Sequence, residues 1–390
     1  MKFVENDKKI PKLSQSIIEF FGKTGTINFF SSFICIFIGI LFGFILMVAL
    51  DPGAALKGLG ALLSSGFSNN NQIAYVLYNS VPTMLAGVAI AFCFKLGLFN
   101  IGVTGQVTFG AFVGVVCGLS GIPWYICIIF AGIAGMLAGM IIGILKAKFN
   151  VNEVLSGIML NWILYYVIGI LGKTVFNNKS FIDKLEPSYF RVLSGNALLP
   201  DMGLSSVLPG MNIGIIVAIV IIITLQVVLN YTVFGFELKM SGLNRDAAKY
   251  CGVNQTKSII LALCIAGACA GIGGYIIYAN PYYPLKFIYS SDSNSLLGTG
   301  FDGISVSLIA QNSPIGCIIS AIFLNYIEAA SPSLKSASAT YNLHYTELIN
   351  AIIIYTASFS SFMGLLLRKG NRKILENFSR DKDLTEMEGR

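Results

Sequence analysis

Long apolar segments, each about as long as a membrane is thick, recur along almost the whole chain and alternate with polar stretches. A membrane-spanning helix needs about 20 mainly apolar residues, and the segments 27–50, 73–94 and 124–145 all meet that requirement. Charged residues make up only 12% of the chain, against roughly 25% in a soluble protein. The sequence therefore predicts an all-α, polytopic membrane protein with little room for a soluble domain.

We expect about ten spanning helices, which form one transmembrane domain over residues 27–367. A charged N-terminal segment (1–26) precedes this domain, and a charged tail (368–390) follows it. Two polar loops interrupt it, at 172–211 and at 235–257. The expected spans are 27–50, 73–94, a third that contains 97–114 and ends before Ser120, 124–145, 152–171, 212–234, 258–279, 295–310, 315–330 and 347–367.

The basic residues predict the orientation of these spans, because cytoplasmic segments carry an excess of Lys and Arg. If the N-terminus is cytoplasmic, 19 of the 26 basic residues lie in inner segments and 7 in outer ones. This split predicts that both termini are cytoplasmic. The loop 172–211 would then be extracellular, and the loop 235–257 would be cytoplasmic.

The stretch 97–114 differs from the other spans because glycines and polar side chains interrupt it. Asn100, Thr104 and Gln106 bring hydrogen-bonding groups to membrane depth, where a glycine-broken backbone persists only if it is buried in protein or lines a watery cavity. Interrupted helices of this kind form substrate sites in transporters. Close packing of neighbouring helices through small residues is an equally good explanation, and the two are compatible.

A second broken span resembles the first. Gly97-Leu-Phe-Asn-Ile-Gly-Val and Gly300-Phe-Asp-Gly-Ile-Ser-Val both place an amide or an acid close behind an aromatic residue. In the expected topology, spans two to five and seven to ten run in opposite senses, which is the arrangement of an inverted-repeat transporter.

Two acids stand nearest the membrane interior, and ionisable groups at that depth are functional candidates. Asp302 could cap a broken helix or face the translocation path, whereas Glu153 sits near the inner end of its span, where a carboxylate reaches water. In the fourth span, Gly135, Gly139 and Gly143 recur every four residues and predict a seam for close helix packing.

No residues suggest catalysis, a metal site or a cofactor. His344 is the single histidine, and the eight cysteines lack zinc-like spacing. Gly22-Lys23-Thr24 and Gly172-Lys173-Thr174 are not phosphate-binding loops, because the required earlier glycine is replaced by Ile17 and by Val167. ATP chemistry would therefore belong to a partner, and the scattered basic residues do not form the clustered face that nucleic-acid binding needs.

The inner loop carries a short motif with a known counterpart. Asp246-Ala247-Ala248, three further residues and Gly252 resemble the Glu-Ala-Ala-x-x-x-Gly signature with which permeases of ATP-binding-cassette (ABC) importers present a coupling helix to their ATPase. Asp246 stands where that signature has Glu. Asn244 can cap such a helix, and Asp246 in its first turn complements the helix dipole.

Further blocks resemble the branched-chain amino acid and ribose permease superfamily, in particular its nucleoside subgroup, and imply the fold of the cobalamin-importer permeases. These blocks are 95–106, 152–161, 241–248 and 301–306, spread over most of the membrane domain. Thr104 departs from that subgroup, which commonly has a small or acidic residue there.

The resemblance implies an importer permease in a bacterial plasma membrane that moves nucleosides inward. It implies three partners, namely a sister permease in a heterodimer, a cytoplasmic ATPase and an extracellular substrate-binding lipoprotein. Ribose, other simple sugars and branched-chain amino acids remain alternative substrates, and a secondary transporter is a rival class. The expected pathway residues are Asn100, Thr104, Gln106, Asn161 and Asp302, and the expected ATPase-coupling residues are Asn244, Arg245, Asp246, Ala247, Ala248 and Gly252.

Overall fold

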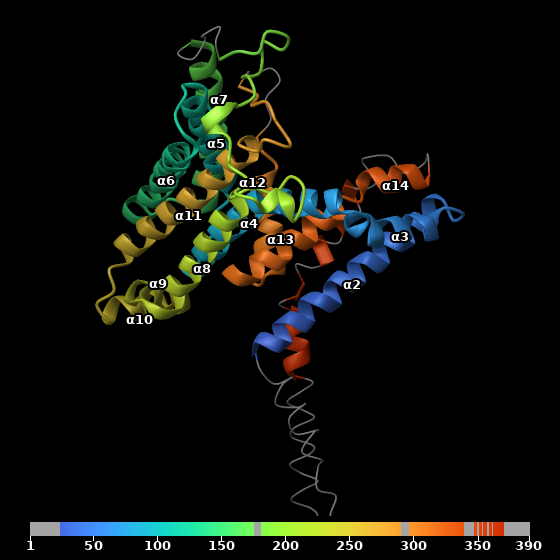
Figure 1. Cartoon of the computed structure of the whole chain (residues 1–390). Coiled ribbons are helices and arrows are strands. Elements are labelled where there is room, and N and C mark those ends of the chain that lie inside the picture. Colours follow the sequence, from blue (N-terminus) through green and yellow to red (C-terminus); the bar gives the residue numbers. More distant parts are fainter. Residues whose placement is uncertain are drawn as a thin grey trace, which may run out of the picture. The chain divides into compact units, whose positions relative to one another are not determined.

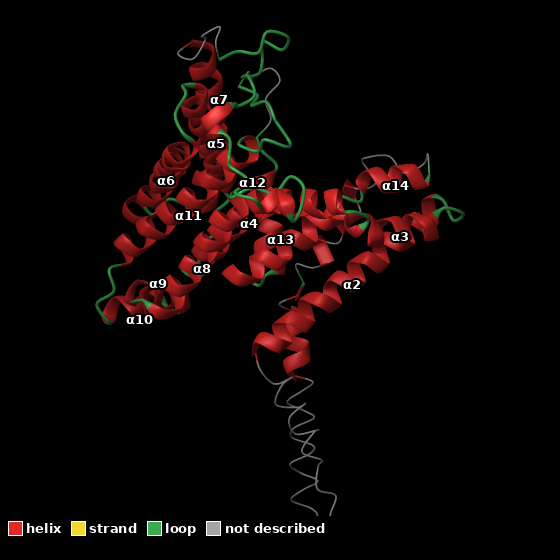
Figure 2. Ribbon diagram, viewed as in Figure 1, coloured by secondary structure: helices red, strands yellow, loops and turns green. Residues whose placement is uncertain are grey.

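The structure is a computed structural model that describes residues 24–174, 181–289, 296–338, 347–348, 351–352, 354–356, 359–360 and 362–369. Within these residues the regular structure is helical (Figure 2), and strand-like pairing is limited to two isolated bridges, Ile182 with Phe190 and Tyr189 with Ile288. The predicted all-α class is therefore confirmed.

The helices that can be bounded are labelled in Figure 1. They are α2 (Thr24–Leu50), α3 (Ala55–Ser64), α4 (Asn70–Phe94), α5 (Val103–Leu119), α6 (Trp124–Phe149), α7 (Glu153–Thr174), α8 (Gly214–Tyr231), α9 (Val233–Leu243), α10 (Arg245–Tyr250), α11 (Gln255–Tyr278), α12 (Thr299–Ile309), α13 (Pro314–Glu328) and α14 (Ser331–Ala337), with short 3-10 turns at Ser65–Phe67, Gly195–Ala197 and Leu204–Ser206.

Seven of the described helical segments are long and apolar enough to cross a membrane, so the chain is a polytopic membrane protein. They are Phe30–Leu50, Asn70–Phe94, Trp124–Phe149, Glu153–Thr174, Gly214–Tyr231, Gln255–Tyr278 and Pro314–Ala337. Val103–Leu119 and Thr299–Ile309 are apolar but shorter. These are the two spans that the sequence predicted to be broken, and the tenth predicted span, 347–367, is described only in short pieces.

The chain divides into two compact units. One comprises residues 1–46 and 351–390, and its described part consists of most of α2 and short helical segments from 351 to 369. The other comprises residues 47–350 and contains α3 to α14. All the candidate sites lie in this second unit.

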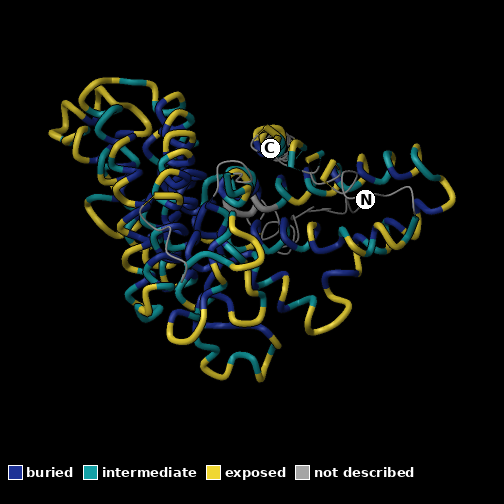
Figure 3. The backbone as a smooth tube through the Cα atoms, turned by 90° about the horizontal axis from the view of Figure 1, so that it is seen from above, coloured by how far each residue is buried: buried dark blue, intermediate teal, exposed yellow. Residues whose placement is uncertain are grey.

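Two helices form the centre of the 47–350 unit. In the most apolar 18-residue stretch of each helix, 89% of α4 and 72% of α11 is buried inside the protein. In α8 the buried share is only 28%. Buried residues gather in the middle of this unit, and exposed ones lie on its outer helices and loops (Figure 3). The Tyr78 hydroxyl of α4 donates to the Ile276 carbonyl of α11, 2.5 Å away, and the Cys93 thiol faces the Ala262 carbonyl. These pairs make the two central helices antiparallel.

α6 packs on α11 through the predicted glycine seam, which is confirmed. A Cβ atom on Gly135 would lie 2.1 Å from the Gly267 carbonyl oxygen, and one on Gly139 would lie 2.1 Å from the Leu263 carbonyl oxygen. Gly271 of α11 also faces α5, because a Cβ on Gly110 would lie 2.3 Å from its Cα. The three backbones therefore touch, which only glycine permits.

α12 and α13 pack on the other central helix, α4. A Cβ on Gly87 would lie 2.5 Å from the Val306 side chain of α12. The Asn325 amide of α13 donates to the Thr83 hydroxyl at 3.1 Å, and the Ser80 hydroxyl donates to the Ala321 carbonyl at 3.3 Å. Thus α4 contacts α12 and α13 as α11 contacts α5 and α6.

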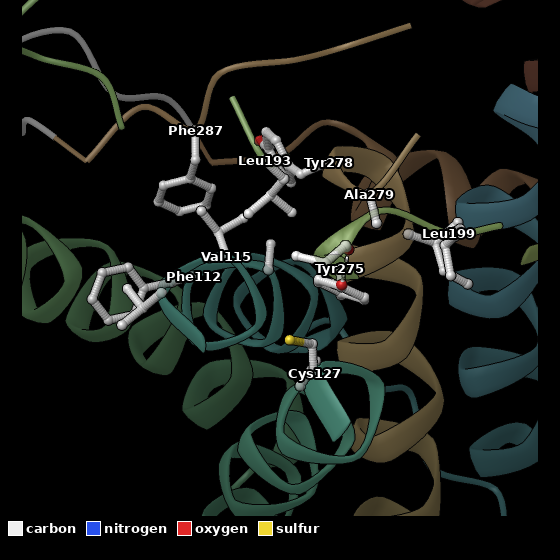
Figure 4. Close-up of a cluster of buried hydrophobic side chains, with 14 of the residues drawn as sticks. Phe112, Val115, Cys127, Leu193, Leu199, Tyr275, Tyr278, Ala279 and Phe287 are labelled. Carbon is white, nitrogen blue, oxygen red and sulfur yellow. Dashed lines mark hydrogen bonds between the residues drawn. The ribbon is translucent and has the colours of Figure 1, made fainter. Parts of the chain in front are cut away.

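A hydrophobic cluster closes one end of α5, α6 and α11 (Figure 4). Phe112 and Tyr275 contribute from α5 and α11, while Phe190 and Phe287 come from the connecting loops. The Phe190 N–H donates to the Phe287 carbonyl at 2.8 Å, and the Leu199 N–H donates to the Ala279 carbonyl at 2.9 Å. The loop after α7 is therefore folded onto the helices as a cap.

Candidate functional site

The backbone breaks where the sequence predicts it. α4 ends at Phe94, Gly97 adopts a left-handed backbone with φ of +72°, and α5 starts only at Val103. Leu96 and Leu98 anchor the break because both side chains are buried. The polar stretch thus enters α5 from a tight turn, so the N-terminal amides of α5 need partners from elsewhere.

Asn100 and Gln106 provide partners for each other. The Asn100 Nδ2 donates to the Gln106 Oε1 at 3.1 Å, and the Gln106 Nε2 donates to the Asn100 Oδ1 at 3.4 Å. Their exposed fractions are 1% and 0%, and neither side chain lines a described cavity. In this conformation the two amides form a closed pair.

Asn161 of α7 satisfies the start of α5. Its Oδ1 accepts from the Gly105 N–H at 2.8 Å, and its Nδ2 donates to the Ile101 carbonyl at 3.1 Å. Both the oxygen and the nitrogen of this amide therefore form hydrogen bonds with the backbone between α4 and α5. Glycine allows this approach, since a Cβ on Gly157 of α7 would lie 2.8 Å from the Gly102 nitrogen.

The second broken span begins beside the first. A Cβ on Gly300 would lie 2.4 Å from the Cα and 2.6 Å from the Oγ1 of Thr104, so the starts of α12 and α5 touch. The buried Thr104 hydroxyl has no hydrogen-bond partner among the described residues. The two look-alike stretches noted in the sequence are therefore neighbours in space.

Two cavities lie on either side of the start of α12. One, of about 540 Å³, is lined by Asn161 and by apolar and aromatic side chains that include Trp162 and Phe301. The other, of about 220 Å³, is more polar and is lined by Asp302 together with Glu328 of α13. Of the five predicted pathway residues, Asn161 and Asp302 therefore line cavities in this conformation.

Glu328 is a site candidate that the sequence analysis missed, although a carboxylate inside an apolar run was a visible signal. Its neighbours Asn79, Thr83 and Asn325 line the same cavity. Glu153, by contrast, forms an ion pair with Lys146 at 2.8 Å across the α6–α7 turn. Its position is explained by that pair.

The predicted coupling helix is α10. It starts at Arg245, and the Asn244 side chain caps it by accepting from the Ala247 N–H at 3.0 Å. At its other end, the Val253 N–H donates to the Ala248 carbonyl and the Gly252 N–H to the Lys249 carbonyl, which is a Schellman ending.

The φ of +83° at Gly252 fits the left-handed residue of that ending. Ala248 is buried, while Arg245, Asp246 and Ala247 are exposed. The segment from Asn244 to Gly252, called the knob below, is therefore rigid and exposed. The backbone groups at both of its ends have hydrogen-bond partners.

The segment that carries this knob touches the central break. A Cβ on Gly242, at the end of α9, would lie 2.1 Å from the Lys95 carbonyl oxygen. Burial lowers the pKa of Lys95 below its usual range, and the nearby positive charge of Lys239 lowers it further. α9 and the break before α5 thus share one contact point.

No group of three or more His, Cys, Asp or Glu side chains is placed to hold a metal ion within the described parts of the chain. The cysteines are free, and Cys251 is exposed next to the knob.

Comparison with known proteins decides the family. The family model for the permease component of the branched-chain amino acid transport system matches residues 72–358, about three quarters of the chain. The chain belongs to this permease family. It is an ABC transporter permease, a transport subunit that is not itself catalytic. Such a permease works with an ATPase and a substrate-binding protein.

Three relatives are informative about this permease. The nucleoside ABC transporter permease protein NupB of Lactococcus lactis is 30% identical over 86% of this chain and 92% of its own length. The guanosine ABC transporter permease protein NupP of Bacillus subtilis is 30% identical over 86% of this chain and 96% of its own length. NupQ, a second guanosine permease protein of B. subtilis, is 26% identical over 65% of this chain and 80% of its own length. No solved structure matches the permease.

Proposed function

We propose that this permease moves nucleosides into the cell, driven by ATP hydrolysis on a separate subunit. The observation that carries the substrate class is the similarity, over 86% of the chain, to two permeases named for nucleosides and for guanosine. A nucleoside is polar but uncharged, so amides and hydroxyls can pass it through without binding it too tightly to release. Ribose, other simple sugars and branched-chain amino acids are the alternatives to be tested.

The proposed fold has ten spans, with both termini in the cytoplasm and inverted repeats over spans two to five and seven to ten. Two features support the repeats. The contacts of α4 with α12 and α13 correspond to those of α11 with α5 and α6, and the starts of the short helices α5 and α12 touch. The pseudo-symmetry would relate α4 to α11 and α5 to α12.

A sister permease is the proposed second half of the transport path. NupP and NupQ occur in the same organism, both are named guanosine permease proteins, and both are similar to this chain. This supports a heterodimer, with a substrate-binding lipoprotein on its extracellular face.

Uptake into vesicles tests the main proposal. The permease is co-expressed with its ATPase and sister permease, reconstituted, and supplied with the substrate-binding protein. We expect ATP-dependent accumulation of guanosine and adenosine, and much less of ribose or leucine. Accumulation driven by an ion gradient with this chain alone would establish a secondary transporter instead, and ATP-driven uptake of ribose or leucine alone would replace the substrate class.

The knob formed by Asn244 to Gly252 is the proposed contact with the ATPase. Its support is the satisfied ends of α10, the exposed Arg245 and Asp246, and the contact of the adjoining α9 with the break before α5. Movement of the ATPase could reach the broken span through this contact.

Two variants test the knob. Gly252→Pro forces φ to about −65°, and Asp246→Lys opposes the helix dipole; both should leave membrane insertion intact and abolish substrate-stimulated ATP hydrolysis. Gly121→Pro is the matched control, because Gly121 has nearly the same backbone, with φ of +84°, and equally open surroundings in the α5–α6 turn. Normal stimulation in both knob variants would remove the coupling role.

A further inference from the structure

The polar cavity beside α12 lies between α4 and α13 and has a volume of about 220 Å³. A second cavity of about 530 Å³ shares Tyr75, Glu328 and Ala329 with it and is lined by Asn71 and Gln72 at the start of α4. Both cavities therefore lie toward the first half of α4, whereas the knob segment meets the other end of α4, at Lys95. In the proposed orientation a solute arriving from outside reaches these cavities before it reaches the break.

The walls of the smaller cavity offer hydrogen-bond acceptors in excess. Asp302 and Glu328 both line it, and no basic side chain lines it in the described part of the chain. Uncompensated carboxylates at this depth are costly and mark functional sites. A ligand that donates hydrogen bonds would offset that cost.

Asn325 adds a further hydrogen-bond acceptor to the wall of this cavity. Its side chain is 7% exposed and lines the same cavity. Its Nδ2 donates both to the Thr83 hydroxyl and to the Ala321 carbonyl, whereas its Oδ1 accepts no hydrogen bond from the described residues. This amide oxygen is therefore available to a hydrogen-bond donor in the cavity, whether a solute or water.

Aromatic rings stand beside these acceptors. The rings of Tyr75 and Tyr283 meet edge to face with centroids 5.6 Å apart, and those of Tyr78 and Tyr283 lie 6.1 Å apart. Aromatic faces bind planar bases by stacking, and a carboxylate is a suitable acceptor for ribose hydroxyls, as in dinucleotide-binding proteins. Carboxylates beside tyrosine rings thus match the two halves of a nucleoside.

We propose that this cavity is a nucleoside subsite of the permease, in which Asp302 and Glu328 accept hydrogen bonds from the ribose hydroxyls and Tyr75 packs on the base. The proposal rests on the nucleoside function proposed above. Because Gly300 and Gly303 of α12 touch α5 and α4, respectively, a ligand bound at Asp302 sits on the helix that joins both.

The test compares guanosine with 2′,3′-dideoxyguanosine in the reconstituted, complete transporter. Asp302→Asn and Glu328→Gln keep the shape of each side chain and remove its charge. A hydrogen bond to a charged group is strong enough that its loss should lower the guanosine preference by about tenfold. The same binding protein is used throughout, so its own selectivity cancels between variant and wild type. Glu186→Gln, an exposed carboxylate outside the cavity, should leave the ratio unchanged.

The outcomes separate the subsite from the function. A structural role of the carboxylates would slow both substrates by the same factor, and an unchanged ratio would overturn the subsite while leaving the nucleoside function intact. An unchanged ratio, together with a requirement for a metal cation that the wild type shows and the variants lose, would instead identify a cation site. If the wild type transports neither substrate, the proposed function fails and the subsite fails with it.

A matched pair of variants tests whether Tyr75 packs on the base. Tyr75→Phe keeps the ring and should transport guanosine almost normally, whereas Tyr75→Leu should lower uptake by about tenfold through lost stacking. Equal uptake by the two variants would remove Tyr75 from the subsite.

Discussion

The contact of α6 with α11 and the contact of α13 with α4 are built differently, although each joins an outer helix to a central one. The first is closed by glycines, so that backbone touches backbone at Gly135 and Gly267. The second is held by the polar pair Asn325 and Thr83 and encloses a cavity. We infer that the first contact is the rigid part of the permease and that the second is the part able to rearrange around a solute.

The largest expected effect comes from filling the glycine seam. Gly135→Ala places a methyl group 2.1 Å from the Gly267 carbonyl oxygen, so the helices must separate, and overpacking of this kind costs about 1–3 kcal/mol or more. The unfolding temperature of the detergent-solubilised protein measures the loss.

Two controls sharpen this prediction. Gly87→Ala meets the Val306 side chain at 2.5 Å, whereas the nearest backbone atom of another helix, the Gly303 carbonyl oxygen, is 3.5 Å away, so this change should cost less. Gly60→Ala, which meets nothing within 4 Å, should be neutral or slightly stabilising. Equal destabilisation by Gly135→Ala and Gly87→Ala would show that the contact of α4 with α12 is packed as tightly as the glycine seam.

The second largest effect should be a difference in how well water reaches the two helix contacts. In a background without native cysteines, a cysteine at position 79 should react with a small water-soluble reagent, and cysteines at 138 and 266 should not. Positions 100, 104 and 106, which are buried here, should react only in the nucleotide state that opens the path. Absence of labelling at these three positions in every nucleotide state would place the path elsewhere.

Leucine at Asn100 or at Gln106 complements the labelling. Each single change leaves the other amide buried without its partner, which costs about 1–3 kcal/mol, so the double variant should be more stable than either single one. Transport should fall sharply in all three variants. Normal transport would make the pair a packing device only.

The smallest expected effect concerns the cap over the glycine-packed side. Lys286 contacts Asp183 at 3.2 Å and Glu186 at 2.9 Å. The N–H of Leu185, and then Lys286, hold the pKa of Asp183 below its usual value. Because this folded-state pKa is depressed, its stabilisation is present above the unfolded value of about 3.9 and is lost as pH falls through the folded value.

Removal of the lysine tests the cap. Lys286→Met should lower the unfolding temperature slightly at neutral pH and make its drop on acidification smaller, because less of the Asp183 pKa shift remains. Both effects should be small, because the groups are partly exposed. An identical acid profile for the variant would show that the ion pairs contribute nothing to the cap.

Local signals made part of this molecule predictable. The apolar runs predicted the long helices, the glycines at 97 and 102 coincide with the break before α5, and Asn244 and Gly252 bracket α10 as cap and ending. The segment 51–72, between the first two predicted spans, contains the short helix α3 at Ala55–Ser64. Its weakly amphipathic pattern over residues 54–63 agrees with that helix.

The partners of the polar side chains were not predictable in this way. Asn161 looked like a pathway residue, and its amide is committed to Gly105 and Ile101, more than fifty residues away in sequence. Asn325 and Thr83 meet across an even longer separation. Such pairs depend on how whole helices pack.

The sequence by itself determined that this chain is helical, where its helices break, and that a capped knob follows the sixth predicted span. Hydrophobicity, glycine and capping residues act over a few neighbouring positions, so their effects are visible in the sequence. Only the tertiary structure decided that Asn100 and Gln106 close on each other while Asp302 and Glu328 share a cavity without a basic partner in the described part of the chain. Hydrogen bonds and charges act across space, and their free energy depends on which helices the packing brings together.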